Sequence, residues 1–331
     1  MKARRSRKSW PIALAVLAFF LFIFFTRTNP RKILDSFAQV SWGWAIGAAL
    51  LNIFNTWIEA LRWKLILSST KKEAKVSKVF AALLAGVVGN VILPLKLGEG
   101  VRAYFISKKE EIRFSSAFST VVLDRLADII FFFILVLITA FFFPFGPQIR
   151  RMIFVALGLL AVGIASLVVI IKLNSNLSSK GKLGRKLAEQ INHFKLGLRA
   201  LQDGRIMLPA AVLSGLSWVM RLIITYLMFN AFHFSLPLIA VAVTLILVNL
   251  GIAAAGTPAN LGEFEFSILA ALKIFSVDTE PAISFAIALH LIEVVPIVLL
   301  GIAAIWINGF SFRLLQESKD RLRNIAFEGN E

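Results

Sequence analysis

Long apolar runs are the feature of this sequence that most restricts its fold. Residues 114–143, 206–229 and 281–307 are each long enough to cross a bilayer as a helix, which takes about 20 residues. Hydrophobic residues make up 58% of the chain and charged residues 17%, against roughly 45–50% and 25% in soluble domains. The sequence therefore predicts an all-α polytopic membrane protein. It excludes a soluble enzyme, a secreted disulfide scaffold and a disordered chain.

Basic residues cluster at the ends of these runs. In a soluble protein the net charge of +17 would favour a nucleic-acid partner, but this distribution follows membrane topology instead, so no nucleic acid is expected. The N-terminus, residues 62–78, residues 172–205 and the tail 308–331 are all basic. We therefore expect all four to be cytoplasmic in a multi-pass protein of the cytoplasmic membrane. Cysteine is absent and three histidines lie far apart, so we expect no metal and no cofactor.

Six full spans and two broken segments are expected. The spans are residues 10–25, 40–58, 114–143, 152–171, 206–229 and 281–307. Residues 79–93 are too short to span and stop at Pro94, and residues 236–255 stop before Pro258. If either segment crossed alone, a basic loop would face outside, against the charge rule. The rule is obeyed if 79–106 and 236–275 are re-entrant helical hairpins, each returning to the side it entered from.

The two breaks share a sequence, which indicates an internal repeat. Pro94 to Glu99 and Pro258 to Glu263 both read Pro-x-x-Leu-Gly-Glu. The long spans that follow share a basic-Leu-x-acid pattern, which begins at Arg125 in one and at His290 in the other. We expect one transmembrane domain over 1–331, with half-repeats at about 10–143 and 152–307. Three spans per half make the repeat inverted, and paired breaks in inverted halves mark a transporter's binding site.

Residues 172–205 contain one amphipathic helix. Apolar residues recur at helical spacing, at Leu183, Leu187, Ile191, Phe194, Leu198 and Leu201, with basic residues opposite. This pattern favours a helix lying on the cytoplasmic leaflet, and docking of a partner is the alternative.

Carboxylates, prolines and glycines at the two breaks are candidate functional residues. Glu99 and Glu263 each follow a glycine at the start of a short helix. They either satisfy the helix dipole or bind a cationic group, a proton or a coupling ion at membrane depth. Pro94 and Pro258 end the incoming helices, while Gly98 and Gly262 allow the backbone to turn.

Charged residues inside the apolar helices complete the candidate site. Asp124, Arg125 and Asp128 share one helix and form either a structural ion-pair cluster or part of a binding site. Arg62 and Arg102 are candidate phosphate clamps. For Arg62, snorkelling to the interface is the favoured interpretation, and Glu59 one turn away is its expected partner. The remaining candidate binding residues are Asn90, Arg221, Asn260, Glu265, His290 and Glu293.

These motifs resemble those of the flippase-like membrane family that includes the transmembrane part of lysylphosphatidylglycerol synthase. The resemblance rests on residues 61–67, 89–102 and 123–128 and on the late Pro-x-x-Leu-Gly-Glu break, and it covers about 10–310. The sequence departs from the family at Ala259 and Asn260, where the family is usually glycine-rich. A downstream aminoacyltransferase domain is not expected. The resemblance implies lipid translocation without lipid aminoacylation, membrane lipids as partners, and a homodimer.

The function expected is that of a lipid flippase or scramblase, not an enzyme. A lipid with a charged headgroup (a phospholipid, an aminoacylated phospholipid or a lipid-linked intermediate) would pass through a midplane cavity between the hairpins. Proton coupling would fall on Glu99, Glu263 or Asp128. The alternatives are a secondary transporter of a soluble anion or sugar, a non-catalytic subunit of a lipid-modifying enzyme, and a lipid-dependent glycosyltransferase. Short outer segments at 26–39 and 144–151 disfavour the last.

Overall fold

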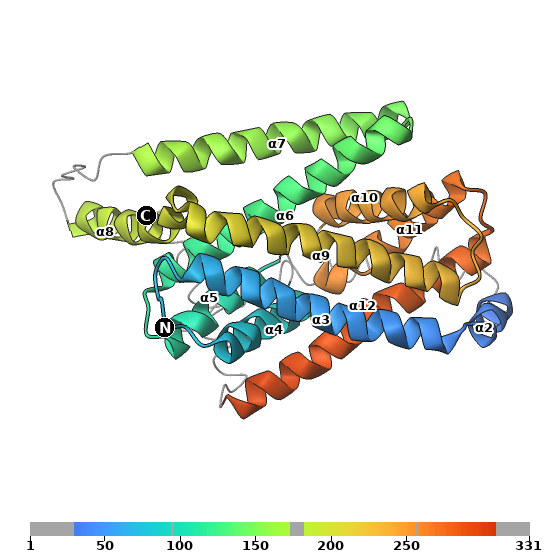
Figure 1. The fold of residues 1–331 in the computed structure, drawn as a ribbon, viewed down its shortest axis with the longest axis horizontal. Helices are drawn as coiled ribbons and strands as arrows, with labels where there is room; N and C mark the ends of the chain where they lie inside the picture. Colours follow the sequence, from blue (N-terminus) through green and yellow to red (C-terminus); the bar gives the residue numbers. More distant parts are fainter. Residues whose placement is uncertain (1–29, 94–95, 173–181, 256, 309–331) are drawn as a thin grey trace, which may run out of the picture. The chain divides into compact units, whose positions relative to one another are not determined.

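The computed structural model describes residues 30–93, 96–172, 182–255 and 257–308, and their regular structure is entirely helical. The helices are α2 Pro30–Ala38, α3 Trp42–Leu67, α4 Val76–Ile92, α5 Gly98–Lys109, α6 Phe114–Phe142, α7 Pro147–Lys172, α8 Lys182–Leu198, α9 Gly204–Ala231, α10 Leu238–Ala255, α11 Glu263–Ile274 and α12 Thr279–Ile307 (Figure 1). Two short 3₁₀ helices, η1 Arg199–Gln202 and η2 Pro258–Asn260, join them. The all-α class is confirmed for this part of the chain. The expected span 10–25, Pro94 and tail residues 309–331 lie outside it.

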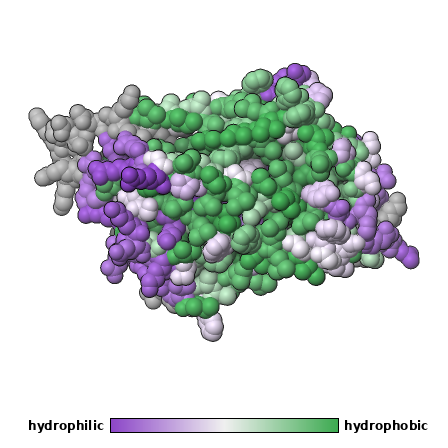
Figure 2. Space-filling model, viewed as in Figure 1, coloured by the Kyte–Doolittle hydropathy of each residue, from purple (hydrophilic) through white to green (hydrophobic). Residues whose placement is uncertain are grey.

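Three of the described helices are apolar and long enough to cross a membrane: residues 147–166 of α7, α9 and α12. Hydrophobic residues cover most of the face drawn in Figure 2, and Phe141, Phe154 and Trp306 are among the exposed large side chains. Such a surface is unfavourable in water and is expected against lipid. α3 and α6, with 26 and 29 residues, are of similar length. Six spans stay a prediction.

α3 extends further than the sequence indicated. It continues to Leu67, past the expected end at residue 58, so Arg62 and Trp63 lie within a helix rather than in the loop after it. Two residues of this last part of the helix, Ile66 and Leu67, are fully buried. Their burial explains why the helix continues, since packing of apolar residues stabilises a helix. The basic residues that begin at Arg62 had suggested an earlier end.

The order and lengths of the helices repeat along the chain. The helices α3 to α6 have 26, 17, 12 and 29 residues, and α9 to α12 have 28, 18, 12 and 29. Each series therefore consists of a long helix, a shorter one, a break with a 12-residue helix, and a second long helix. This is the succession that the shared motif predicts. The opposite membrane orientation of the two halves stays a prediction.

The described residues belong to two compact units. Of the residues described, unit 1 includes 30–52, 90–93, 96, 222–255 and 257–296, and unit 2 includes 53–89, 97–172, 182–221 and 297–308. The core of unit 1 contains buried apolar residues of α3, α9, α10, α11 and α12, including Met228, Ile268 and Phe285. In unit 2, α5 and α8 each contact α6.

Glycines bring the two helices of each broken pair close together. In unit 2, a Cβ on Gly89 of α4 would lie 2.9 Å from the Cα of Gly98 in α5. In unit 1, α10 and α11 lie side by side (Figure 1), and a Cβ on Gly251 would lie 1.9 Å from Ser267 Oγ. Because the atom near Gly89 belongs to the backbone, close packing of α4 on α5 requires glycine there. At Gly251 a larger residue would displace the Ser267 hydroxyl.

The amphipathic helix forms as expected, and its end contacts the protein. Leu198 and Ala200 are buried with Ile66, Leu123 and Ala210 in a small apolar cluster. Arg113, just before α6, forms an ion pair with the exposed Glu189 of α8. The hydrogen bond and the positive charge of Arg113 lower the pKa of Glu189. The apolar stripe therefore packs partly on unit 2.

Candidate functional site

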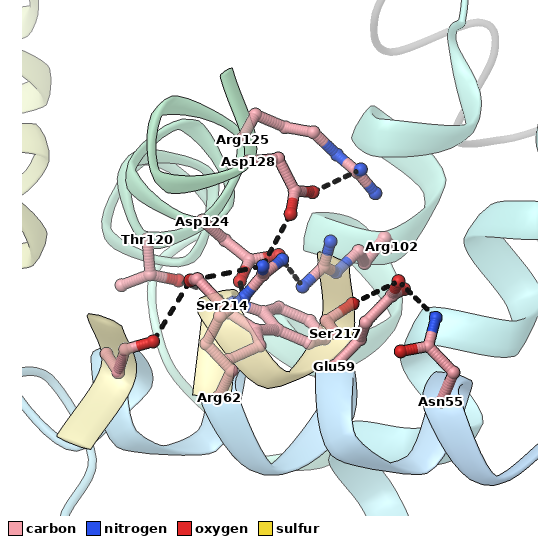
Figure 3. Close-up of polar contacts among 12 residues, drawn as sticks. Asn55, Glu59, Arg62, Arg102, Thr120, Asp124, Arg125, Asp128, Ser214 and Ser217 are labelled. Carbon is pink, nitrogen blue, oxygen red and sulfur yellow. Dashed lines mark hydrogen bonds and ion pairs between the residues drawn. The ribbon is translucent and has the colours of Figure 1, made fainter. Parts of the chain in front are cut away.

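Unit 2 contains a buried network of charged side chains centred on Asp124 (Figure 3). Arg62 Nε donates to Asp124 Oδ1 and Arg102 Nη2 donates to Asp124 Oδ2, both at 2.7 Å. The side chains of all three residues are only 1% exposed. They come from α3, α5 and α6, so one carboxylate joins three helices.

Asp128 extends this network by one helical turn. Arg62 Nη1 donates to Asp128 Oδ1 at 2.5 Å, and Arg125 Nη1 donates to Asp128 Oδ2 at 3.0 Å. Arg125 Nη2 also lies 3.0 Å from Glu99 Oε1 at the start of α5. The sequence placed Asp124 and Asp128 on one face because they are four residues apart, and the structure confirms that placement.

The burial of Arg62 contradicts the snorkelling interpretation. Its guanidinium binds two aspartates and also donates to Ser214 Oγ at 3.3 Å. Beside it, Trp63 Nε1 donates to Thr120 Oγ1 at 3.1 Å, and the guanidinium of Arg102 lies 3.8 Å from the centre of the Trp63 ring. The snorkelling interpretation was wrong because α3 continues as a buried helix instead of ending at an interface.

Glu59 pairs with Arg221 of α9 rather than with Arg62, its expected partner. Arg221 Nη2 lies 2.5 Å from Glu59 Oε1, which also accepts hydrogen bonds from Ser217 Oγ and Asn55 Nδ2. Residues of α3 and α9 are thereby joined within unit 2 (Figure 3). We call Arg62, Arg102, Arg125, Arg221, Glu59, Glu99, Asp124 and Asp128 the charge network. It holds four cations and four carboxylates, so its formal charges balance.

The charge network has a closed centre and an open edge. Arg125 is 41% exposed and Glu99 is 19% exposed, whereas Asp124 is enclosed. Arg102 Nη1 and Glu99 Oε2 lie 3.6 Å apart, too far for a hydrogen bond. Neither atom has a hydrogen-bond partner among the described residues. Both atoms are buried, so the exposed side chain of Arg125 is the part of this edge that can accept a further polar group.

Unit 1 contains the second break, residues 257–262, in an unusual backbone conformation. Ala259 and Asn260 have φ values of 55° and 56°, and Gly262 has 91°. Glycine and, to a lesser extent, asparagine tolerate such values, whereas alanine rarely does, so Ala259 is the strained residue. Gly262 therefore provides the turn predicted for it. Pro258 begins η2, three residues after α10 ends.

Two glutamates of α11 fasten the second break. Thr257 donates to Glu263 from its backbone N at 3.1 Å and from Oγ1 at 2.8 Å. Gly262 N donates to Glu265 Oε2 at 2.8 Å. Both carboxylates thus hold backbone of the loop in which the strained residue lies.

His290 of α12 binds the same loop. Its Nδ1 lies 2.5 Å from Glu265 Oε1, and its Nε2 lies 2.9 Å from the carbonyl oxygen of Ala259. The ring stacks on Phe264, with a centroid separation of 4.4 Å, and the residue is 7% exposed. Further along α12, the backbone carbonyl of Glu293 accepts a hydrogen bond from Asn52 Nδ2 of α3 at 2.9 Å.

The other candidates are less closely involved, and some contributing residues were not predicted. Asn90 lies half-buried near the end of α4, and Asn260 half-buried in η2. Sequence analysis missed the neutral partners of the charged groups, which are Trp63, Thr120, Ser214, Ser217, Thr257 and Ala259. These are common residue types, and a backbone carbonyl carries no sequence signal. Among the described residues, no cluster of His, Cys, Asp or Glu suited to a metal occurs.

An apolar exterior, helices of membrane-crossing length and interior ion pairs define an integral helical membrane protein. The chain belongs to the family described as the lysylphosphatidylglycerol synthase TM region, which matches residues 10–301. The resemblance seen in the sequence is thereby confirmed.

Archaeal relatives extend this assignment. A UPF0104 membrane protein of Methanocaldococcus jannaschii is 27% identical over 216 residues, covering 64% of this chain and 90% of the relative. A second one from that organism is 22% identical and covers 89% and 94%. One from Methanothermobacter thermautotrophicus is 23% identical and covers 84% and 89%. The similarity to the last two therefore extends over most of each chain.

Proposed function

We propose that this protein is a lipid flippase or scramblase that moves a lipid with a charged headgroup across the cytoplasmic membrane. Membership of a family defined by the transmembrane region of lysylphosphatidylglycerol synthase supports this proposal. The protein acts as a transporter and not as an enzyme. Its substrate is a phospholipid, an aminoacylated phospholipid or a lipid-linked intermediate.

The observation that carries the proposal is the exposure of Arg125. This residue lies eleven positions into α6, roughly 17 Å from the helix start at 1.5 Å per residue, and 41% of its side chain is exposed. A guanidinium facing acyl chains near the middle of a bilayer costs about 2.5–3.5 kcal/mol or more. The exposed part of Arg125 therefore faces water or a lipid headgroup.

The open edge of the charge network suits a headgroup that carries phosphate. Arg125 offers an exposed guanidinium for phosphate oxygens, and the buried Arg102 lies behind Glu99, with which both arginines pair. Glu99 offers a carboxylate for a headgroup amine. A bare ion or a sugar uses this combination less fully than a charged amphiphile does.

We further propose the membrane arrangement that the helix lengths support. α4 and α10, with 17 and 18 residues, span about 26–27 Å, short of a core of about 30 Å. Each forms a re-entrant hairpin with the 12-residue helix that follows. Six full spans, an inverted repeat, cytoplasmic termini and a homodimer complete this arrangement.

Transbilayer lipid movement tests the proposal directly. The purified protein is reconstituted in liposomes that contain labelled phosphatidylglycerol, an aminoacylated form, a glycolipid or a polyprenyl phosphate. We expect movement of at least one of these above empty vesicles. If no lipid moves, with or without a proton gradient, the proposal is wrong. Uptake of a labelled soluble anion by the same vesicles would then favour a secondary transporter.

A further inference from the structure

The two helical series fasten their short helix to the long helix in the same way, but with different bases. In unit 2, Arg125 of α6 binds Glu99 in the first turn of α5 at 3.0 Å. In unit 1, His290 of α12 binds Glu265 in the first turn of α11 at 2.5 Å. Arg125 and His290 hold the same place in the basic-Leu-x-acid pattern. Arginine keeps its charge at all working pH values, whereas histidine gains and loses a proton near neutrality.

The hydrogen bonds of His290 require one proton beyond the neutral ring. The carbonyl oxygen of Ala259 can only accept, so Nε2 must carry a hydrogen. The contact between Nδ1 and Glu265 Oε1 needs another hydrogen, on Nδ1 or on the carboxyl group. The pair therefore holds one exchangeable proton. Its loss would place a ring lone pair against a carboxylate.

Two carboxylates and an aromatic ring surround His290. Glu265 from α11 and Glu293 from its own helix are the charged groups that act on the ring. Glu263 of α11 is bound to Thr257. Phe264 covers a ring face, and α3 presents only the neutral amide of Asn52, which donates to the backbone of α12.

The carboxylates expected to carry a coupling proton are differently placed. Asp128 and Glu99 each pair with arginine, a residue that cannot give up its proton to them. Glu263 accepts two hydrogens from Thr257. The geometry therefore favours His290 and Glu265 as the titrating pair.

We infer that the His290–Glu265 pair is a proton-binding site whose proton holds the second break closed during the transport cycle. This inference rests on the proposed transport function. Release of the proton separates Nδ1 from Glu265, and movement of Glu265 frees Gly262 N. The strain at Ala259, whose φ of 55° is unfavourable for a non-glycine residue, then favours opening. Re-binding of one proton restores both contacts, so protons are conserved over a cycle.

Cysteine labelling measures this opening without any assay of transport. The chain has no cysteine, and Leu261 is 42% exposed within the second break. A Leu261→Cys variant in proteoliposomes is labelled with a water-soluble maleimide at about pH 5 and pH 8, on either side of the usual histidine pKa. Adding His290→Arg to this background fixes the charge. Both proteins share the intrinsic pH response of the thiol. The ratio of their labelling rates therefore isolates the effect of the proton held by His290 and Glu265.

We expect the labelling rate of Leu261→Cys to rise several-fold more with pH than that of the double variant with His290→Arg. Glu265→Gln, added to Leu261→Cys, should also remove this additional rise of the labelling rate with pH. This variant decides the test if His290→Arg does not fold. The matched control is His233→Gln, which removes the other histidine of unit 1, bonded to Ser41, and should leave the response intact. Equal responses with and without His290 would overturn the inference.

Lipid movement in the same vesicles separates the two proposals. If lipid moves but labelling shows no response that depends on His290, the proton site is wrong and the transport function stands. If labelling responds as expected but no lipid moves, the transport function is wrong, and the His290–Glu265 proton-binding site stands. Where both hold, His290→Arg should also remove the pH dependence of lipid movement.

Discussion

Asp124 is the residue on which the centre of the charge network depends. Its two oxygens each bind a different arginine, and both arginines are buried. Removing one member of a buried ion pair leaves the other charge uncompensated, which is far more costly than never having buried the pair. The energetic role of Asp124 is therefore to neutralise Arg62 and Arg102.

Replacement of this carboxylate by an amide of the same shape tests that role. We expect Asp124→Asn to lower the free energy of unfolding by about 3–5 kcal/mol, measured by denaturant unfolding in detergent. Asp35→Asn, on the exposed side of α2, is the matched control and should change it by less than about 0.5 kcal/mol. Equal effects of the two substitutions would contradict the account of the network.

Individual residues show how far the sequence can predict the site. Spacing along one helix correctly placed Asp124, Arg125 and Asp128 together, because helical geometry is local. Partners across helices were not predictable in this way. Glu59 seemed matched to Arg62 by its spacing, but Arg221 binds it because packing of α9 brings that residue closer.

At the scale of single elements, the close contact of α4 with α5 depends on small residues. A Cβ at Gly89 would approach the backbone of Gly98 and would also lie 3.2 Å from a methyl carbon of Val101. Backbone cannot move aside as a flexible side chain does, so the two helices would have to separate. The glycine therefore sets the distance between the two helices.

Two glycine substitutions separate packing from helix propensity. We expect Gly89→Ala to destabilise the protein by about 1–3 kcal/mol, the usual cost of overpacking, in a thermal unfolding assay. Gly47→Ala in α3 has no atom within 4 Å of the added carbon and should be neutral or stabilising by about 0.5–1 kcal/mol. A Gly89→Ala protein as stable as Gly47→Ala would disprove the close contact.

The contact of α8 with α6 should depend on pH. Because Arg113 lowers the pKa of Glu189, their pairing stabilises this contact above the ordinary glutamate pKa. That stabilisation is lost as the pH falls through the lowered pKa, in acid below the ordinary glutamate range. Hydrogen exchange of the α8 amides should therefore accelerate in acid beyond the intrinsic rate. Glu189→Gln should remove this dependence, and an unchanged dependence in that variant would refute the role of the pair.

Element boundaries were partly predictable from sequence. The two breaks were located correctly, and the short helices follow them. Gly262 provides the predicted turn at the second break, but the turn predicted for Gly98 was wrong, because Gly98 begins α5 and Lys96 has the positive φ of 54°. The end of α3 was misplaced because tertiary burial of Ile66 and Leu67 outweighed the basic residues nearby. The strained backbone of Ala259 had no signal in the sequence, since alanine usually avoids that conformation.

At the scale of the whole molecule, two series of helices with matching lengths carry matching contacts between a base and an acid. One contact uses arginine and the other histidine. The repeat was visible in the sequence through the Pro-x-x-Leu-Gly-Glu motif. The motif did not identify the acid partner of His290, because Glu265 lies two residues beyond it. The opposite membrane orientation of the two halves stays a prediction.

The central claim is that the open edge of the charge network handles a lipid headgroup, and one measurement tests it most directly. Transbilayer movement of the lipid identified with the wild-type protein is compared between Arg125→Gln and Arg150→Gln, a control at an exposed arginine of α7. We predict that Arg125→Gln, still folded by gel filtration, slows movement about tenfold or more, as loss of one charged contact of about 1.4 kcal/mol would do. Arg150→Gln should keep the wild-type rate. Wild-type movement in folded Arg125→Gln would contradict the account.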